Sequence, residues 1–248
     1  MSAAARAEVF LRSLVYLAIL AFVTPFYAAA VLLLAPLPRI PRWIFISWWP
    51  RGATILARWL LGIRYEVIGR EHIPREPVVI LAKHQSTWET FAFSGIFPPH
   101  VYVLKRELLR IPFFGWGLAL FSPIAIDRSN RSSAMRRTIE LGRARFAQGF
   151  SIMIYPEGTR TAVGAHGKYR LGGANLAINL GAKVLPVAHN AGLLWPRNSF
   201  LKHPGKVTVI IGKPIDTAGA TPVDVMQKVE TWIEGEVARL VHRAKAAH

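Results

Sequence analysis

A histidine followed five residues later by a glutamate stands in residues 83–89, KHQSTWE, directly after the apolar run 77–81. The pKa of a histidine lies close to neutrality, and a carboxylate bonded to one ring nitrogen orients the other to accept a proton. If His84 closes a strand and Glu89 lies in the next helical turn, the chain can bring them together. The pattern predicts a general base with its orienting carboxylate. By themselves the two residues fit equally a loop histidine and a glutamate at the positive end of a helix.

Residues 155–160, YPEGTR, end another apolar run and combine a proline, a glycine, a carboxylate and an arginine. Glycine permits a close approach of the backbone, and the planar guanidinium of arginine binds phosphate through two parallel hydrogen bonds. A simple turn does not require this combination. We therefore interpret Glu157, Gly158, Thr159 and Arg160 as a motif that binds a ligand or shapes its site.

Two further basic residues follow apolar runs and are candidates for binding an anion. Lys105 follows residues 101–104, and Arg128 follows residues 123–126. The segment 105–117 then joins this basic start to a stiff apolar turn. It fits the wall of an apolar groove, and it also fits a helix start packed by aromatic side chains.

Short apolar runs recur along the chain after Gly62, mostly separated by segments of helical length. This alternation is typical of an α/β fold with a mostly parallel sheet flanked by helices. In such sheets ligands bind at the carboxyl ends of the strands, so the four candidate segments are expected to converge there. A helix at residues 171–180 and an amphipathic C-terminal helix, to which we assign a packing role, complete the pattern. The expected strands are residues 63–69, 77–81, 101–104, 123–126, 151–155, 184–188 and 207–211.

The composition favours an anionic partner. Lys and Arg number 31 against 14 Asp and Glu, which gives a formal net charge of +17. Such a charge suits nucleic acid, an anionic membrane or a phosphorylated substrate, and does not choose among them. The chain has no cysteine, which excludes disulfides, thiolate metal sites and an acyl-cysteine intermediate. We expect His166, His189 and His203 to be loop or surface histidines, because they lack metal-ligand spacing.

The composition of the N-terminal part of the chain indicates attachment to a membrane. Residues 13–38 carry no charge, and a helix of that length exceeds a hydrocarbon core of roughly 30 Å. Pro25 would kink a spanning helix or turn a re-entrant pair of helices. More arginines follow this run than precede it, which predicts a cytoplasmic location for the rest of the chain, on the inner membrane.

Four tryptophans interleaved with arginines follow the uncharged run and have the composition of an interfacial belt. We expect a boundary near residue 62, with residues 1–61 as a membrane-anchoring helical segment and residues 62–248 as the α/β domain. The four tryptophans are Trp43, Trp48, Trp49 and Trp59.

Over about residues 60–215 the chain resembles the membrane-associated glycerophospholipid acyltransferases, most closely the bacterial enzymes that act on 1-acylglycerol 3-phosphate. Four family motifs occur in order, although Glu89 stands where the first motif has an aspartate. The matching residues are His84 and Glu89; Lys105, Glu107, Leu108, Pro112 and Gly115 with residues 126–128; Glu157 to Arg160 letter for letter; and residues 184–188 around Pro186.

The resemblance implies acyl transfer from acyl-CoA or acyl-carrier protein to the 2-hydroxyl of lysophosphatidate, in phospholipid biosynthesis at an anionic membrane. His84 would be the base and Glu89 its partner, while Arg128 and Arg160, and more weakly Lys105, would hold the acceptor phosphate. Backbone N–H groups near Gly158 would stabilise the oxyanion. Nothing in the pattern requires a metal or a redox cofactor.

Two alternatives stay open. An acyltransferase for another acceptor, such as glycerol 3-phosphate or another lysophospholipid, would carry the same motifs. A non-enzymatic basic protein that docks on anionic membranes or nucleic acid would explain the net charge of +17 equally well. It would not explain why the His84–Glu89 pair, Asp127–Arg128 and residues 157–160 each follow a predicted strand, and we therefore expect no nucleic-acid partner.

Overall fold

The computed structural model describes residues 2–126 and 131–246 of the chain, and Arg128 lies outside the described residues. The described part is an α/β structure with one seven-stranded sheet in the order β1-β7-β6-β2-β5-β3-β4. The strands are β1 (Ile63–Ile68), β2 (Val79–Ala82), β3 (His100–Lys105), β4 (Ile124–Ile126), β5 (Ser151–Ile154), β6 (Val184–His189) and β7 (Gly205–Ile211). Each strand overlaps an apolar run that the sequence marks, and this confirms the predicted fold class.

The sheet is parallel except where β6 pairs antiparallel with β7. The central strand β2 lies between β6 and β5 and is buried over its whole length. Parallel strands covered on both faces carry apolar residues without alternation, as residues 79–82 do. The edge strand β1 is exposed at most of its positions, which fits its alternating sequence.

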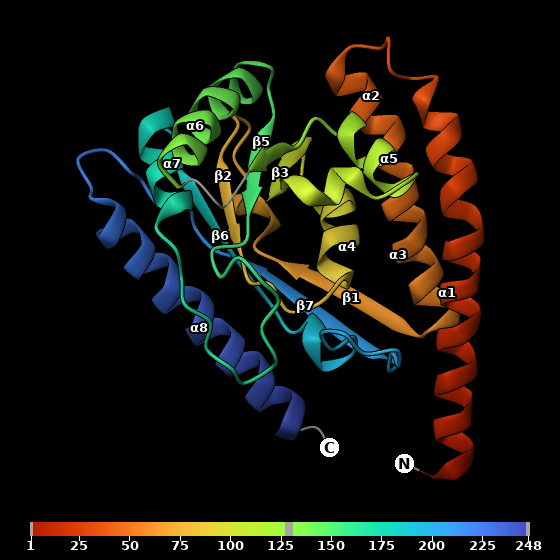
Figure 1. The fold of residues 1–248 in the computed structure, drawn as a ribbon. Coiled ribbons are helices and arrows are strands. Elements are labelled where there is room, and N and C mark those ends of the chain that lie inside the picture. The colour runs from red at the N-terminus through yellow and green to blue at the C-terminus, as the bar shows by residue number, and fades with distance from the viewer. Residues whose placement is uncertain (1, 127–130, 247–248) are drawn as a thin grey trace.

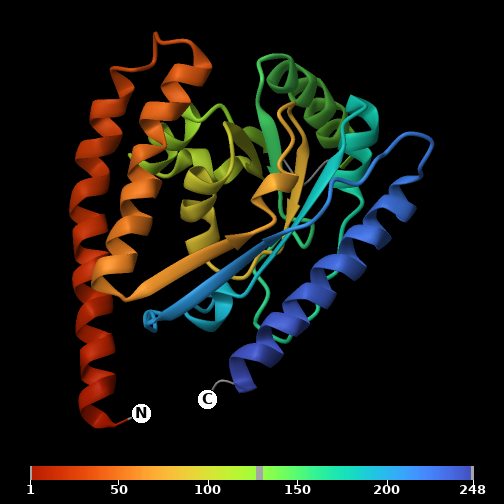
Figure 2. The ribbon, with the colours of Figure 1, turned by 180° about the vertical axis from the view of Figure 1, so that it is seen from behind.

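Helices cover both faces of the sheet (Figures 1 and 2). Val79 and Leu81 of β2 pack in a cluster with α7 and α8, whereas Ile80 and Ala82 pack in a second cluster with α4. This division follows from the two-residue period of a strand, which sends successive side chains to opposite faces. The helices are α1 (Ala3–Leu32), α2 (Arg39–Ile46), α3 (Trp48–Leu60), α4 (Trp88–Ile96), α5 (Phe114–Leu120), α6 (Arg131–Ala147), α7 (Gly172–Leu180) and α8 (Pro222–Ala246).

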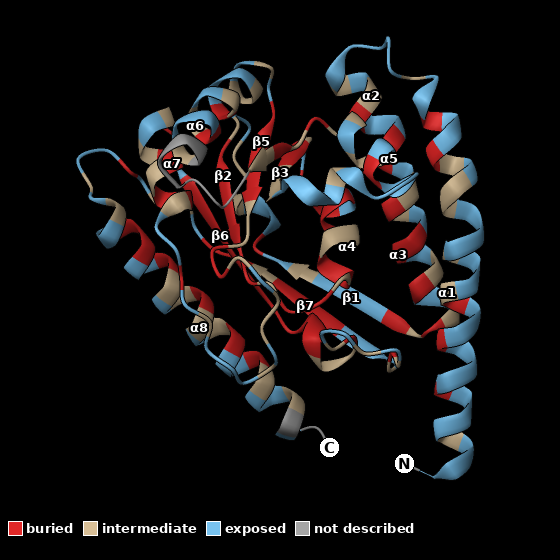
Figure 3. Ribbon diagram, viewed as in Figure 1, coloured by how far each residue is buried: buried red, intermediate tan, exposed pale blue. Residues whose placement is uncertain are grey.

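The N-terminal helix α1 continues through Pro25 and does not turn there into a re-entrant pair. By length and composition it could cross a membrane, and 17% of its most apolar window is buried. A stripe of α1 packs on the rest of the protein: the Tyr16 hydroxyl donates to the Ala53 carbonyl at 3.1 Å, and Ser13 Oγ accepts from the Lys202 amide at 3.0 Å. The outer side of the helix is largely exposed (Figure 3).

The stripe on α1 reaches the core of the sheet. Tyr16 is fully buried in the same cluster as Ile80 of β2 and Val207 of β7. The boundary near residue 62 therefore marks a change from helices to alternating strands and helices. Side chains from both sides of this boundary pack in one hydrophobic cluster. Independent folding of residues 62–248 stays a prediction.

The four tryptophans do not form one belt. Trp48 and Trp59 are exposed, but Trp43 of α2 is 2% exposed. Its indole Nε1 donates to the His100 carbonyl at the start of β3, at 2.7 Å. The prediction of an interfacial belt was therefore wrong for Trp43, because one side of the short amphipathic helix α2 faces the edge of the sheet.

We expect Trp43→Ala to lower the free energy of unfolding by about 3–5 kcal/mol, since it removes a large buried ring and leaves a cavity. Trp59→Ala, a matched change at a side chain that is 77% exposed, should cost less than about 0.5 kcal/mol. Urea unfolding in detergent, followed by circular dichroism, measures both. Equal losses in the two variants would contradict the core position of Trp43.

Candidate active site

His84 follows β2 and Glu89 lies in the first turn of α4, as the sequence predicts. His84 Nδ1 lies 2.9 Å from Glu89 Oε1. The same oxygen accepts the backbone amides of Gln85 at 2.9 Å and Ser86 at 2.8 Å. Three donors therefore hold one fully buried carboxylate oxygen, and the glutamate at this position reaches the histidine despite its extra methylene.

The charge of Glu89 fixes the tautomer of His84. Burial alone would raise the pKa of Glu89, but the field of His189 and the hydrogen bonds from His84 and Ser86 outweigh it and hold the pKa below its ordinary value. An ionised carboxylate only accepts hydrogen bonds, so His84 Nδ1 carries the hydrogen and Nε2 keeps its lone pair. The imidazole ring also stacks on Tyr155 at a centroid distance of 3.9 Å. The ring is thereby oriented from its edge and from its face.

Glu157 is buried beneath the site and does not line the cavity described below. Its Oε2 accepts the backbone amide of His84 at 2.8 Å, and its Oε1 lies 2.6 Å from Lys83 Nζ. Thr161 Oγ1 also donates to Oε1, at 2.8 Å. The geometry therefore assigns Glu157 to holding the loop after β2, whereas its neighbours Gly158 and Thr159 reach the cavity.

Gly158 adopts a left-handed conformation with φ of +71°, which favours glycine at this turn. Its amide donates to the Tyr155 carbonyl at 2.9 Å. The expected oxyanion donor at Gly158 is thus already engaged within the turn. Next to it, Arg160 lines the cavity, and its buried Nε has no hydrogen-bond partner among the described residues. An unpaired buried guanidinium N–H is suited to an anionic ligand, because leaving it unbonded is costly.

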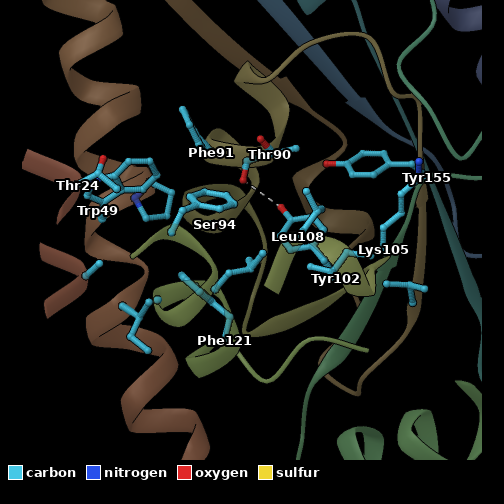
Figure 4. Close-up of a pocket in the computed structure, with 18 of the residues that line it drawn as sticks. Thr24, Trp49, Thr90, Phe91, Ser94, Tyr102, Lys105, Leu108, Phe121 and Tyr155 are labelled. Carbon is cyan, nitrogen blue, oxygen red and sulfur yellow. Dashed lines mark hydrogen bonds between the residues drawn. The ribbon is translucent and has the colours of Figure 1, made fainter. Parts of the chain in front are cut away.

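A cavity of about 540 Å³ opens beside His84, which is within the range of about 300–1,000 Å³ usual for small-molecule sites. Figure 4 shows side chains of α1, α3 and α4 on one side of it, with Tyr155 and Lys105 on the other. His84, Lys105 and Arg160 all contribute to its lining, so the structure brings these predicted residues together. The remainder of the lining is mainly apolar.

The segment 105–117 lines this cavity, as the groove interpretation predicts. Leu108, Phe113 and Phe114 contribute apolar side chains to it, and α5 continues the wall. A Cβ at Gly115 would collide with the Leu109 carbonyl, so the turn that shapes this wall requires a glycine.

Two residues near the site were not assigned to it from the sequence. Arg197 lines the cavity and donates to the Arg160 carbonyl at 2.7 Å. His189 is fully buried at the end of β6, and its Nε2 lies 2.9 Å from the Lys83 carbonyl, so its prediction as a loop or surface histidine was wrong. Its position after a strand was a usable signal. No local sequence pattern marks Arg197, and only the folding of the chain brings it close to the site.

Comparison with known proteins agrees with this geometry. The acyltransferase family matches residues 64–190. A Pseudomonas aeruginosa protein named 1-acyl-sn-glycerol-3-phosphate acyltransferase is 48% identical over 82% of this chain and 81% of its own length. The mouse 1-acyl-sn-glycerol-3-phosphate acyltransferase alpha is 30% identical over 68% of this chain and 61% of its own length.

A solved structure resembles nearly the whole chain. The crystal structure of the 1-acyl-sn-glycerophosphate (LPA) acyltransferase PlsC from Thermotoga maritima matches with a TM-score of 0.79 and 26% identity, over 95% of this chain and 97% of that one. The sequence match spans both the His84–Glu89 pair and the turn at Arg160. The chain therefore belongs to the acyltransferase family.

Proposed function

We propose that the protein transfers an acyl group from a thioester, acyl-CoA or acyl-carrier protein, to the 2-hydroxyl of 1-acylglycerol 3-phosphate, giving phosphatidate for phospholipid biosynthesis. The observation that carries the proposal is the His84–Glu89 pair beside an apolar cavity that also contains Arg160. The names of the relatives support this acceptor. Membership in the acyltransferase family argues against the alternative of a non-enzymatic basic protein that docks on membranes or nucleic acid.

His84 Nε2 removes the proton of the acceptor hydroxyl as its oxygen attacks the thioester carbonyl. Glu89 stabilises the imidazolium that forms, because its charge lies 2.9 Å from Nδ1. When the tetrahedral intermediate collapses, the carbon–sulfur bond breaks and the imidazolium returns the proton to the thiolate. The new ester bond thus forms without a covalent acyl-enzyme.

Cations and apolar side chains would share the binding of the substrates. Arg160 binds the acceptor phosphate, with Lys105 and Arg197 at the same cavity, and the apolar lining takes an acyl chain. The role of Arg128 in phosphate binding stays a prediction.

We also propose that the protein works at the cytoplasmic face of the inner membrane. Helix α1 packs against α3, and both helices expose apolar side chains, among them Phe22 of α1 and Ile55 and Trp59 of α3. Since the opposite stripe of α1 packs on the protein, α1 would rest with one side in lipid and the other on the catalytic part. The excess of basic residues, with a formal net charge of +17, suits an anionic membrane surface.

A panel of acyl donors and acceptors, with products read by mass, tests the function. We expect phosphatidate from lysophosphatidate with acyl-CoA or acyl-carrier protein, and the panel shows which donor is used. Product from glycerol 3-phosphate or another lysophospholipid, with none from lysophosphatidate, would support the other acceptor. No acyl transfer to any acceptor would overturn the assignment.

His84→Ala should abolish this transfer with the fold retained, because it removes the base. Glu89→Gln should reduce kcat less, within the range of about 10²–10⁴-fold typical of general acid–base assistance. It still offers an oxygen to His84 but loses the charge that stabilises the imidazolium. Steady-state kinetics and circular dichroism provide the measurements. Wild-type turnover in folded His84→Ala would remove His84 from the mechanism.

Arg160→Lys should raise KM for lysophosphatidate about tenfold, since lysine keeps the charge but loses the planar fork, at a cost of ~1.5 kcal/mol for one hydrogen bond to a charged group. KM for the acyl donor should change little. Arg136→Lys, at an exposed position of α6, is the matched control and should leave both values unchanged. An equal increase for both substrates would assign Arg160 to structure or to the donor.

The full-length protein should stay bound to anionic vesicles at 1 M salt, because burial of hydrocarbon surface is not screened. A purely electrostatic attachment should be released, since the Debye length falls from about 10 Å at 0.1 M to 3 Å at 1 M. Sedimentation across a salt series distinguishes the two. Complete release by salt would show that α1 is not in the lipid.

A further inference from the structure

Lys83 is a buried cation that the proposed mechanism does not use. Its side chain is 1% exposed, and its Nζ lies 2.6 Å from Glu157 Oε1 and 2.7 Å from Glu234 Oε1. Glu157 belongs to the turn after β5, whereas Glu234 comes from the C-terminal helix α8. One ammonium group therefore joins two carboxylates from distant parts of the chain, directly beneath the site.

An unbroken series of polar contacts leads from α8 to the loop after β2, which carries His84. Glu234 binds Lys83, Lys83 binds Glu157, and Glu157 accepts the backbone amide of His84 at 2.8 Å. Tyr169 Oη donates to Glu234 Oε1 at 2.7 Å and fixes the outer end of the series. Both oxygens of Glu157 are in use, so a displacement of its carboxylate must move the loop that carries His84.

Each of the two carboxylates has a separate task at Lys83. Glu157 supplies charge to Lys83 but must also keep one oxygen on the His84 amide. Without Glu234, the buried ammonium would depend on Glu157 alone and would draw its carboxylate toward Nζ, because unpaired N–H groups in the interior are costly. Glu234 thus lets Glu157 stay in the position that serves His84.

We propose that Glu234 is a positioning residue for proton transfer: acting through Lys83, it keeps Glu157 on the His84 backbone and thereby sets the imidazole against the acceptor hydroxyl. This inference rests on the proposed role of His84 as base. It extends the site to α8, which lies beyond the part of the chain that the acyltransferase family matches, residues 64–190, and to which the sequence assigned packing alone.

Glu234→Gln is the principal test, because it keeps the shape and one acceptor oxygen but removes the charge. We expect kcat to fall about 10-fold to 100-fold, the scale of a small misplacement of reacting groups, while KM for both substrates stays within about twofold. Glu230→Gln is the matched control. Glu230 lies one turn earlier on α8, and its ion-pair partner at 3.4 Å is the exposed His166. This control should retain wild-type kcat.

A double-mutant cycle tests whether Glu234 acts through Lys83. Once Lys83→Met has removed the ammonium, adding Glu234→Gln should cause no further loss of kcat. Tyr169→Phe gives an independent measurement if the Lys83 variant does not fold. It removes only the hydroxyl that holds Glu234, and it should give a kcat between those of the wild type and Glu234→Gln. Circular dichroism and thermal unfolding report the folded fraction by which each kcat is corrected.

Three results would overturn the inference: an unchanged kcat in folded Glu234→Gln, an equal loss in Glu230→Gln, or a full additional loss in the Lys83→Met background. Each differs from failure of the proposed function, which would appear as no acyl transfer to any acceptor, and from failure of His84 as the base, which would appear as activity in folded His84→Ala. If the acceptor is another lysophospholipid, the same variants are measured with that acceptor and the expected ratios are unchanged.

Discussion

The ion pair between Lys83 and Glu157 joins the loops that follow two neighbouring strands, β2 and β5. Glu157 binds Lys83 with one oxygen and the His84 amide with the other. Removing one partner of such a buried pair typically costs about 3–5 kcal/mol, because the remaining charge is left uncompensated. The pair therefore fixes the two loops relative to each other, and with them His84 and Arg160, which these loops carry.

The site combines these buried polar contacts with an apolar cavity wall. The cavity beside His84 is lined by α1, α3, α4 and α5, and also by the basic side chains of Lys105, Arg160 and Arg197. A substrate with a charged head and a hydrocarbon chain matches that combination. The helix that helps to wall the cavity, α1, also exposes apolar side chains outward, so the proposed contact with lipid and the proposed binding of acyl chains involve the same part of the fold.

Much of the fold was predictable because it depends on local patterns. Apolar runs without alternation became buried strands, as at β2, and the ends of adjacent parallel strands converged on one cavity. Composition was a poorer guide among the tryptophans. Trp43 and Trp59 have similar neighbours in sequence, but one packs on β3 and the other faces outward. The direction in which a short helix faces depends on what it packs against, and sequence composition does not record that.

The sequence by itself determined the His84–Glu89 pair and the turn at Arg160, because five residues and a single turn set their geometry. Only the tertiary structure decided how these groups are supported. Glu234 lies 151 residues from Lys83 along the chain and binds it at 2.7 Å, and Arg197 reaches the Arg160 carbonyl across 37 residues. Such contacts exist only after the sheet has brought distant segments together, since no local periodicity encodes which charged side chain will meet a buried partner.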